Sequence, residues 1–294
     1  MIELRVVSSD ADYAAWASIK SRVAPREPVT AAQLRAQHED GRLLLLAAFD
    51  GADAGCGISA PSGFDGRAFV AARVLPEHRR RGVGAELVRA LVEHAQALGR
   101  TGVNAFVGAD DPASLAFAHR YGLEEVDYQL EQVRVVGREA PPPAVDGVEL
   151  VPLGGRRDEL LRAVWPLALE AYEDLPIPGE VTYRLETWLR EEATCPEGSF
   201  VALVEDEPVG YAGLLERAEP GTAEHGLTAV RRDRRGRGLG RALKLAQLHW
   251  ASRAGVRELV TWTQRGNEAM QTLNRSLGYV DRSKELTMQG PLPV

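Results

Sequence analysis

The sequence predicts an α/β fold that is repeated twice along the chain. The hexapeptide Arg79–Gly84 has the pattern R-x-x-G-x-G, and Arg235–Gly240 repeats it 156 residues later. Each glycine-rich loop runs into a segment with the apolar spacing of an amphipathic helix. Each of these helices is followed by a glycine and then by a short run that is typical of a strand. The chain has 294 residues, enough for two domains that each bury a core.

The expected elements follow the same order in both halves. Each half opens with a strand and a helical region, and then has a hydrophobic strand, the glycine-rich loop with its helix, a further strand and a last helix. The strands are expected at Ile2–Arg5, Leu43–Phe49 and Val103–Val107, and at Val148–Val151, Phe200–Val204 and Glu258–Trp262. The last helices are expected at Asp111–Phe117 and Asn267–Leu273.

A proline-rich segment separates the two halves. Gly137–Ala144 contains three consecutive prolines, which cannot continue a strand, and Val148–Val151 then restarts the pattern seen at the beginning of the chain. We therefore place a first domain at 1–137, a linker at 138–146 and a second domain at 147–294.

The two glycine-rich loops are candidate anion-binding turns. Glycines directly before a helix let backbone N–H groups face a ligand, and the first turn of a helix leaves these donors unpaired. A dinucleotide fingerprint would need a third glycine, and a nucleoside-triphosphate loop would need a Gly-Lys-Ser/Thr ending; both are absent. The remaining alternative is an arginine-rich surface turn before an ordinary helix. A single loop would fit this alternative as well as an anion-binding turn, but two loops at equivalent positions make it less plausible.

The loops and the elements after them resemble the GNAT acyl-CoA N-acyltransferases, in two tandem copies. The resemblance implies a mixed, mostly antiparallel sheet flanked by helices in each domain, and acetyl-CoA as the cofactor. It also implies that the loop amides bind the pyrophosphate and that the strand before each loop pairs with the pantetheine. The implied cofactor contacts are Val74, Arg79, Arg80, Arg81, Gly82, Val83, Gly84 and Ala85, and Thr228, Val230, Arg235, Gly236, Arg237, Gly238, Leu239, Gly240, Arg241 and Asn267.

An acyl transfer to an amine needs a group that removes a proton, because an alkyl ammonium with a pKa near 10.4 cannot attack. In well-known members of the family, a glutamate lies eleven residues before the loop. That position is Glu224 in the second domain and Ala68 in the first. His225 is expected on the opposite face of the strand. The second domain is therefore the expected catalytic domain, although Glu224 could instead be a surface residue paired with an arginine.

The sequence departs from the family at the tyrosine that protonates the leaving thiolate in many members. The corresponding positions are Ala118 and Asn274. Asn274 is the candidate donor to the thiolate, whose thiol with a pKa near 8.5 is a tolerable leaving group without help. Asn267 and Asp111 begin the last helices, where the family commonly contacts the cofactor; both also suit an ordinary helix N-cap.

The predicted activity is the transfer of an acetyl group to the primary amine of a small molecule. An acidic insertion-like loop, Glu170–Pro178, would favour a cationic acceptor, whereas the first domain has the basic stretch Lys20–Arg26. Two alternatives stay open: a non-catalytic acyl-CoA-binding or regulatory protein, and a protein N-acetyltransferase. The expected partners are thus a small-molecule amine and, for a homodimer rather than a monomer, a second copy of the chain.

Composition excludes several other classes. The net charge of −7 disfavours non-specific nucleic-acid binding. Two cysteines, Cys56 and Cys195, and six histidines without ligand spacing predict neither a disulfide framework nor a metal site. The sequence has no membrane-length apolar run and no signal-peptide pattern, so a cytoplasmic location without a membrane partner is expected.

Overall fold

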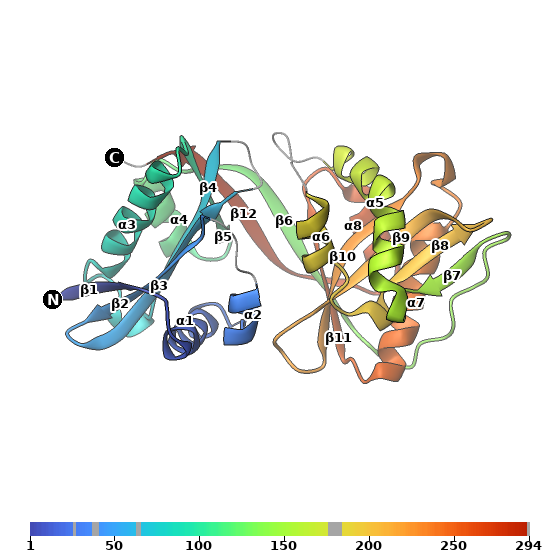
Figure 1. Cartoon of the computed structure of the whole chain (residues 1–294), viewed down its shortest axis with the longest axis horizontal. Helices are drawn as coiled ribbons and strands as arrows, with labels where there is room; N and C mark the ends of the chain where they lie inside the picture. Colours follow the sequence, from blue (N-terminus) through green and yellow to red (C-terminus); the bar gives the residue numbers. More distant parts are fainter. Residues whose placement is uncertain (26–27, 37–40, 63–65, 176–183, 293–294) are drawn as a thin grey trace. The chain divides into compact units, whose positions relative to one another are not determined.

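A computed structural model describes residues 1–25, 28–36, 41–62, 66–175 and 184–292. The chain forms two compact units. Among these residues, the N-terminal unit contains 1–128 together with 285–292, and the C-terminal unit contains 129–175 and 184–284. In each unit, helices cover both faces of a mixed sheet (Figure 1). The predicted α/β fold, with two copies of one arrangement, is confirmed.

The sheet of the N-terminal unit has the strand order β1-β2-β3-β4-β5-β12. All neighbours are antiparallel except β4 and β5, which are parallel. The strands are β1 (Ile2–Val6), β2 (Leu43–Phe49), β3 (Ala52–Pro61), β4 (Arg67–Val74) and β5 (Gly102–Gly108). The helices are α1 (Asp10–Val23), α2 (Ala31–Ala36), α3 (Val83–Ala97) and α4 (Pro112–Arg120).

The sheet of the C-terminal unit repeats this plan in the order β7-β8-β9-β10-β11-β6. Its one parallel pair is β10 and β11. The strands are β7 (Glu149–Pro152), β8 (Phe200–Val204), β9 (Glu207–Glu216), β10 (Thr222–Val230) and β11 (Glu258–Gln264). The helices are α5 (Arg157–Glu173), α6 (Leu185–Glu191), α7 (Leu239–Ala254) and α8 (Glu268–Ser276). This unit also has three short 3-10 helices, η2 (Gly154–Arg156), η3 (Pro196–Gly198) and η4 (Arg232–Arg234), and the N-terminal unit has η1 (Pro76–His78).

The strand that completes each sheet comes from the other half of the sequence. Residues Glu285–Pro291 of β12 (Val280–Pro291) pair with β5, and residues Gln129–Val135 of β6 (Glu124–Val135) pair with β11. The compact units therefore differ from the domains 1–137 and 147–294 that the sequence predicted. Those domain boundaries describe where the sequence repeats, and they stay a prediction. Hydrophobic alternation marks a strand but does not say which sheet the strand joins.

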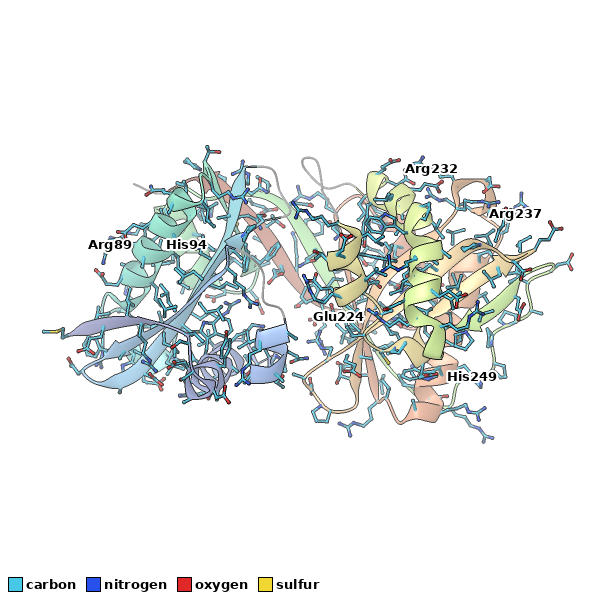
Figure 2. The ribbon with its side chains drawn as sticks, in the orientation of Figure 1. Arg89, His94, Glu224, Arg232, Arg237 and His249 are labelled. Carbon is cyan, nitrogen blue, oxygen red and sulfur yellow. The ribbon has the colours of Figure 1, made fainter. Side chains whose placement is uncertain are left out.

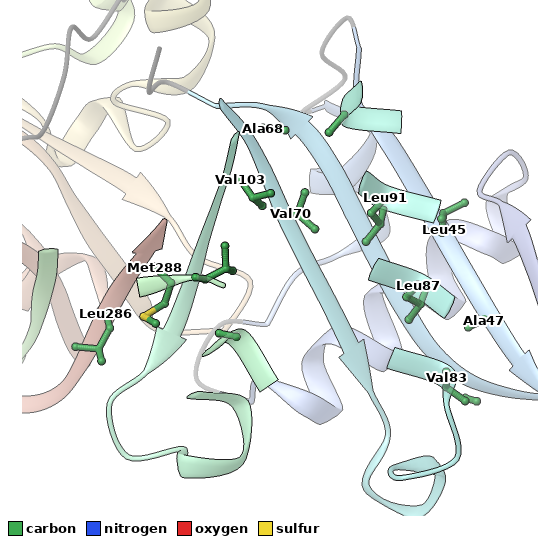
Figure 3. Packing of buried hydrophobic residues seen from close by; sticks show 14 residues of the cluster. Leu45, Ala47, Ala68, Val70, Val83, Leu87, Leu91, Val103, Leu286 and Met288 are labelled. Carbon is green, nitrogen blue, oxygen red and sulfur yellow. The ribbon is translucent and has the colours of Figure 1, made fainter. Parts of the chain in front are cut away.

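Apolar side chains of α3 form the core on one face of the N-terminal sheet. Val83, Leu87 and Leu91 lie within one cluster with residues of β2 and β4 (Figure 3). A Cβ added at Gly57 would lie 2.8 Å from Leu91 Cδ1, so the helix sits directly on the backbone of β3. This close packing fixes the start of α3, and with it the glycine-rich loop.

The opposite face is covered by α1 and α2 in the N-terminal unit and by α5 and α6 in the C-terminal unit. The capping box of Ser9 and Asp12 begins α1. In the C-terminal unit this face is more aromatic, with Trp188 and Tyr211 buried in its cluster. The two units thus share one arrangement of strands and helices but differ in the side chains that pack on this face.

Candidate active site

The two glycine-rich loops have the same geometry. Arg79 Nε donates to Val74 O at 3.1 Å, and Arg235 Nε donates to Val230 O at 2.9 Å. The first arginine of each motif therefore ties the loop to the end of the preceding strand. Backbone conformation also matches, since the fourth residue of each loop is a left-handed glycine, with φ of 87° in one copy and 83° in the other.

Both loops leave the first amides of the following helix open. Gly82 and Gly238 are the N-caps of α3 and α7, and neither N-cap has a side chain that could accept a hydrogen bond from these amides. A Cβ added at Gly236 or Gly238 would meet no atom within 4 Å, so the space beside these two glycines of the second loop is open. Unpaired N–H groups at a helix start suit a phosphate, and a hydrogen bond to a charged group contributes about 1.5–3 kcal/mol. The loop residues thus fit a pyrophosphate.

The end of α5 binds the arginines of the second loop. Arg232 donates to Asp174 at 2.7 Å and to Glu173 at 3.2 Å, and Arg235 donates to Asp174 at 2.6 Å. Glu170 Oε1 accepts from the Arg232 amide at 2.7 Å. Figure 2 labels Arg232 at this end of α5.

The expectation of an insertion-like loop over Glu170–Pro178 was wrong for its first part. Glu170 and Glu173 form the last turn of α5, because the apolar helical pattern continues through this segment; the part from residue 176 lies outside the described residues.

The strand before each loop separates from its parallel neighbour. β10 pairs with β11 only at Thr222, Ala223 and Glu224, and β4 pairs with β5 over the three equivalent residues from Arg67 to Phe69. Beyond this point β10 differs from β4. The register of β10 against β9 shifts between His225 and Thr228, which marks a β-bulge, whereas β4 pairs with β3 without a shift.

Glu224, the base expected from the sequence, is the last residue of β10 that pairs with β11. Its carboxylate forms an ion pair with Arg217, whose side chain is only 9% exposed. The sequence left open whether Glu224 would be a base or a partner of an arginine, and the structure contains that ion pair.

His225 points into the layer under α7. Its Nε2 lies 2.5 Å from the Tyr279 hydroxyl, and burial next to Lys244 holds the pKa of the imidazole well below its usual range. Only 6% of the residue is exposed, so the imidazole belongs to the interior of the C-terminal unit.

A second carboxylate, Glu192, lies beside the bulge of β10. It directly follows α6, and its Oε1 accepts from the Tyr211 hydroxyl at 3.0 Å and from the Leu227 amide at 3.3 Å. Burial raises the pKa of this carboxyl to about 7, although the Tyr211 hydrogen bond opposes the shift. Sequence reasoning missed Glu192, because a glutamate at the end of a short helix is typical of a solvated surface.

Asn274 and Asn267 have structural contacts. Asn274 is fully buried, and its Nδ2 donates to Gln132 at 2.9 Å and to Thr263 at 3.5 Å. The amide that we expected to donate to a thiolate is therefore engaged within the core, and its role toward a thiolate stays a prediction. Asn267 is the N-cap of α8 and accepts from the Met270 amide, as Asp111 does from the Ser114 amide in α4.

The remaining residues expected to contact the cofactor lie on or next to the two loops. Thr228 and Val230 pair with β9, and Val74 pairs with Gly55 of β3, so one edge of each strand stays free beyond the parallel pairing. Arg241 donates to Ser276, and Arg81 lies over the Phe49 ring. Arg237, labelled in Figure 2, lies on the loop before α7. Val83, Gly84 and Ala85 begin α3, Leu239 and Gly240 begin α7, and Arg80 lies in the loop before α3.

Comparison with known proteins identifies the family. The model of the acetyltransferase (GNAT) family matches residues 11–123 and again residues 161–279. The chain belongs to the GNAT acetyltransferase family.

Relatives with a named activity agree with this membership. The mycothiol acetyltransferase of Nocardia farcinica is 30% identical over 287 residues, with 94% of this chain and 88% of that protein covered. The mycothiol acetyltransferase of Rhodococcus opacus is 32% identical over 219 residues, covering 69% and 68%. This GNAT protein is therefore an N-acetyltransferase, as predicted.

Solved structures show the same fold over the whole chain. A tandem GNAT protein from the clavulanic acid biosynthesis pathway superposes with a TM-score of 0.80 at 23% identity and covers 100% of this chain and 99% of its own. A GCN5-related N-acetyltransferase from Sphaerobacter thermophilus gives a TM-score of 0.77 at 21% identity, with 100% and 96% covered. The tandem arrangement of two GNAT copies is thus confirmed.

Two further features concern only the described part of this GNAT chain. None of its helices combines the length and the apolar character that crossing a bilayer requires. No three or more His, Cys, Asp or Glu side chains gather there in a way that could hold a metal ion.

Proposed function

We propose that the C-terminal unit transfers the acetyl group of acetyl-CoA to the primary amine of a small molecule. The observation that carries this proposal is the bulge of β10 between His225 and Thr228, next to the parallel pairing that ends at Glu224. It lies in a unit that also has an open glycine-rich loop and carboxylates beside the separated strand. The N-terminal unit has the loop without the bulge.

The residues of the C-terminal unit fit acetyl-CoA at two places. The amides from Gly236 to Arg241 would bind its pyrophosphate, and the free edge of Thr228–Val230 would pair with its pantetheine. When bound, the cofactor supplies an acetyl thioester, whose carbonyl carbon is open to attack by an amine. Bound at both places, the cofactor is held in a fixed orientation, which lowers the entropic cost of the reaction.

The acceptor is proposed from the named relatives. Several of them are mycothiol acetyltransferases, and this favours the amine acceptor of that enzyme over a protein N-terminus. The acidic end of α5 gives no support to a cationic acceptor, since Glu173 and Asp174 already pair with Arg232 and Arg235. A monomer or a homodimer stays a prediction, as does a cytoplasmic location.

For the N-terminal unit a second function is favoured, cofactor binding without turnover. Its loop matches the other one, but β4 has no bulge, and Phe69 occupies the place in the parallel pairing that Glu224 has in β10. Counting back from the loop gave Ala68, which lies one residue earlier because β10 carries the bulge. A unit of this kind would hold acetyl-CoA and leave the chemistry to the C-terminal unit.

Isothermal titration with acetyl-CoA tests both assignments. The matched variants are Gly84→Asp and Gly240→Asp, which occupy equivalent places in the first turns of α3 and α7 and put a carboxylate where a phosphate would lie. Both glycines have ordinary backbone angles, and an added Cβ meets nothing closer than 3.4 Å at Gly84 and 3.7 Å at Gly240, so Gly84→Ala and Gly240→Ala serve as controls. We expect each Asp variant to lose one of two binding sites.

Turnover is measured in the same variants by mass spectrometry of the acetylated amine, which also works for acceptors that contain a thiol. We expect Gly240→Asp to abolish product and Gly84→Asp to retain it. Product formation that depends on Gly84 and not on Gly240 would place catalysis in the N-terminal unit and contradict the proposal. The absence of product with every amine tested would refute the proposed reaction.

A further inference from the structure

Glu192 is held at the bulge of β10 by several elements. Arg157, the first residue of α5, donates to the carbonyl oxygens of Glu192 at 2.6 Å and of Ala193 at 3.1 Å, and so fixes the end of α6. The Glu192 carboxylate then lies between β9 and β10, where it accepts from Tyr211 and from the Leu227 amide. Only 8% of the residue is exposed.

Two glycines make room for this carboxylate. A Cβ added at Gly213 of β9 would lie 1.9 Å from Glu192 Oε1, and one added at Gly226 of β10 would lie 2.3 Å from the same atom. Any larger residue at either position would collide with the carboxylate. Gly226 and Leu227 also form the bulge itself, so the acid and the irregular strand belong to one local structure.

The N-terminal unit has no such space. The positions that correspond to Tyr211 and Gly213 in the repeat, 155 residues earlier, are Cys56 and Ile58. Both side chains are buried in the apolar cluster under α1 and α2. The phenol partner and the bulge thus occur together in the C-terminal unit and are both missing from the equivalent described strands of the N-terminal unit. The segment equivalent to the end of α6 lies outside the described residues.

The charged and titratable groups around Glu192 and its partner Tyr211 come from two elements, β9 and α5. β9 contributes Tyr211, and α5 contributes Arg157 and Tyr172, whose hydroxyl accepts from Trp188 Nε1 of α6 at 2.9 Å. Arg157 and the Tyr211 hydrogen bond lower the pKa of Glu192, and desolvation, which is larger, raises it to about 7. A carboxylate with this pKa is a stronger base than an exposed one and is still ionised in half of the molecules near neutral pH.

We propose that Glu192, placed at the β10 bulge by Arg157, Tyr211 and the Leu227 amide, accepts the proton from the amine substrate of the C-terminal unit. This assignment rests on the proposed function of that unit. Glu224, which is salt-bridged to Arg217, is then a structural residue at the end of the parallel pairing.

The reaction balances with Glu192 in this role. The carboxylate takes one proton from the substrate ammonium, directly or through one water molecule. The neutral nitrogen attacks the thioester carbon, a C–N bond forms, the C–S bond breaks, and the sulfur leaves with the bonding electron pair. The second proton lost by the nitrogen goes to the thiolate, and Glu192 later returns its own proton to solvent.

The first test compares Glu192→Gln with Glu191→Gln, a change at the exposed neighbour. Glutamine keeps an oxygen that accepts from Tyr211 and Leu227, so we expect thermal unfolding close to that of the wild type. We expect kcat/KM to fall by about 10²–10⁴-fold in Glu192→Gln and to be unchanged in Glu191→Gln, since this is the usual contribution of a positioned base. The acidic limb of the pH profile of kcat/KM, near pH 7 in the wild type, should disappear with Glu192.

The second test is Tyr211→Phe, which removes a hydrogen bond that lowers the pKa of Glu192. The acidic limb should then move to higher pH, while a purely structural Glu192 would leave its position unchanged. A folded Glu192→Gln variant that keeps the wild-type rate and the acidic limb overturns this assignment alone. A wild-type chain that binds acetyl-CoA but acetylates no amine overturns the proposed function and the assignment with it.

Discussion

The buried Lys244 makes the stability of the C-terminal unit depend on pH. This lysine lies on α7 with 1% of its surface exposed, and its Nζ is 5.6 Å from the centroid of the Tyr279 ring. Desolvation lowers its pKa from 10.5 to about 7. We expect Lys244→Met to stabilise the unit, because methionine fills a similar volume without a charge that must be buried.

The size of the effect follows from the pKa. Because the folded pKa is below the unfolded one, the unfolded state binds more protons between these values, and stability rises with pH across this window. A fall from 10.5 to about 7 corresponds to a penalty of at most about 5 kcal/mol below pH 7, and of about 2 kcal/mol at pH 9. The gain from Lys244→Met should therefore be about 3 kcal/mol larger at pH 6.5 than at pH 9.

Urea unfolding followed by tryptophan fluorescence measures this gain, since four of the five tryptophans, Trp165, Trp188, Trp250 and Trp262, belong to the C-terminal unit. With an m-value of about 1–3 kcal/mol/M the midpoints should differ by about 1 M or more. Lys284→Met, at an exposed lysine, is the control for loss of charge. An equal gain at both pH values would mean that Lys244 titrates normally, and the reasoning from burial would be refuted.

Three further predictions concern charges and backbone strain. Glu224→Gln should lower the stability of the C-terminal unit by about 1–3 kcal/mol in urea unfolding, because it leaves the largely buried Arg217 without this ion pair; an unchanged midpoint would argue against the pair. Asp174→Asn should tighten acetyl-CoA binding by up to about fivefold at low salt and have no effect in 1 M salt, since it removes a negative charge from Arg235; titration calorimetry at both salt concentrations decides. Arg80→Gly should raise the melting temperature of the N-terminal unit, because Arg80 has a φ of 63° and a left-handed non-glycine residue costs about 1–2 kcal/mol; a lower melting temperature would contradict this.

The order of strands and helices that the two units share could be predicted from the sequence, because local sequence patterns specify it. The expected strands Leu43–Phe49 and Phe200–Val204 are β2 and β8, residue for residue. The helices after the loops begin at Val83 and Leu239, as the glycines before them and the apolar spacing indicated. Turn glycines and helical periodicity depend only on a few neighbouring residues, so they can be recognised without knowing the rest of the fold.

The chemistry on the α5–α6 face could not be predicted in the same way. Glu192 is distinguished by the missing side chains of Gly213 and Gly226, which are distant in sequence and meet only in the folded sheet. Glu224 could be found by counting back from the loop, but its pairing with Arg217 could not. Asn274 matched a position in a pattern, yet its burial next to Gln132 depends on which strand completes the sheet.

The origin of the last strand in each sheet limits how this protein can be divided. A fragment that ends in the proline-rich segment would contain β5 without Glu285–Pro291, and the other fragment would contain β11 without Gln129–Val135. Each would expose an unpaired edge that invites aggregation, while carrying the strand that the other lacks. Cutting the chain in this segment is therefore expected to destabilise both units, because each sheet takes its last strand from the other half of the sequence.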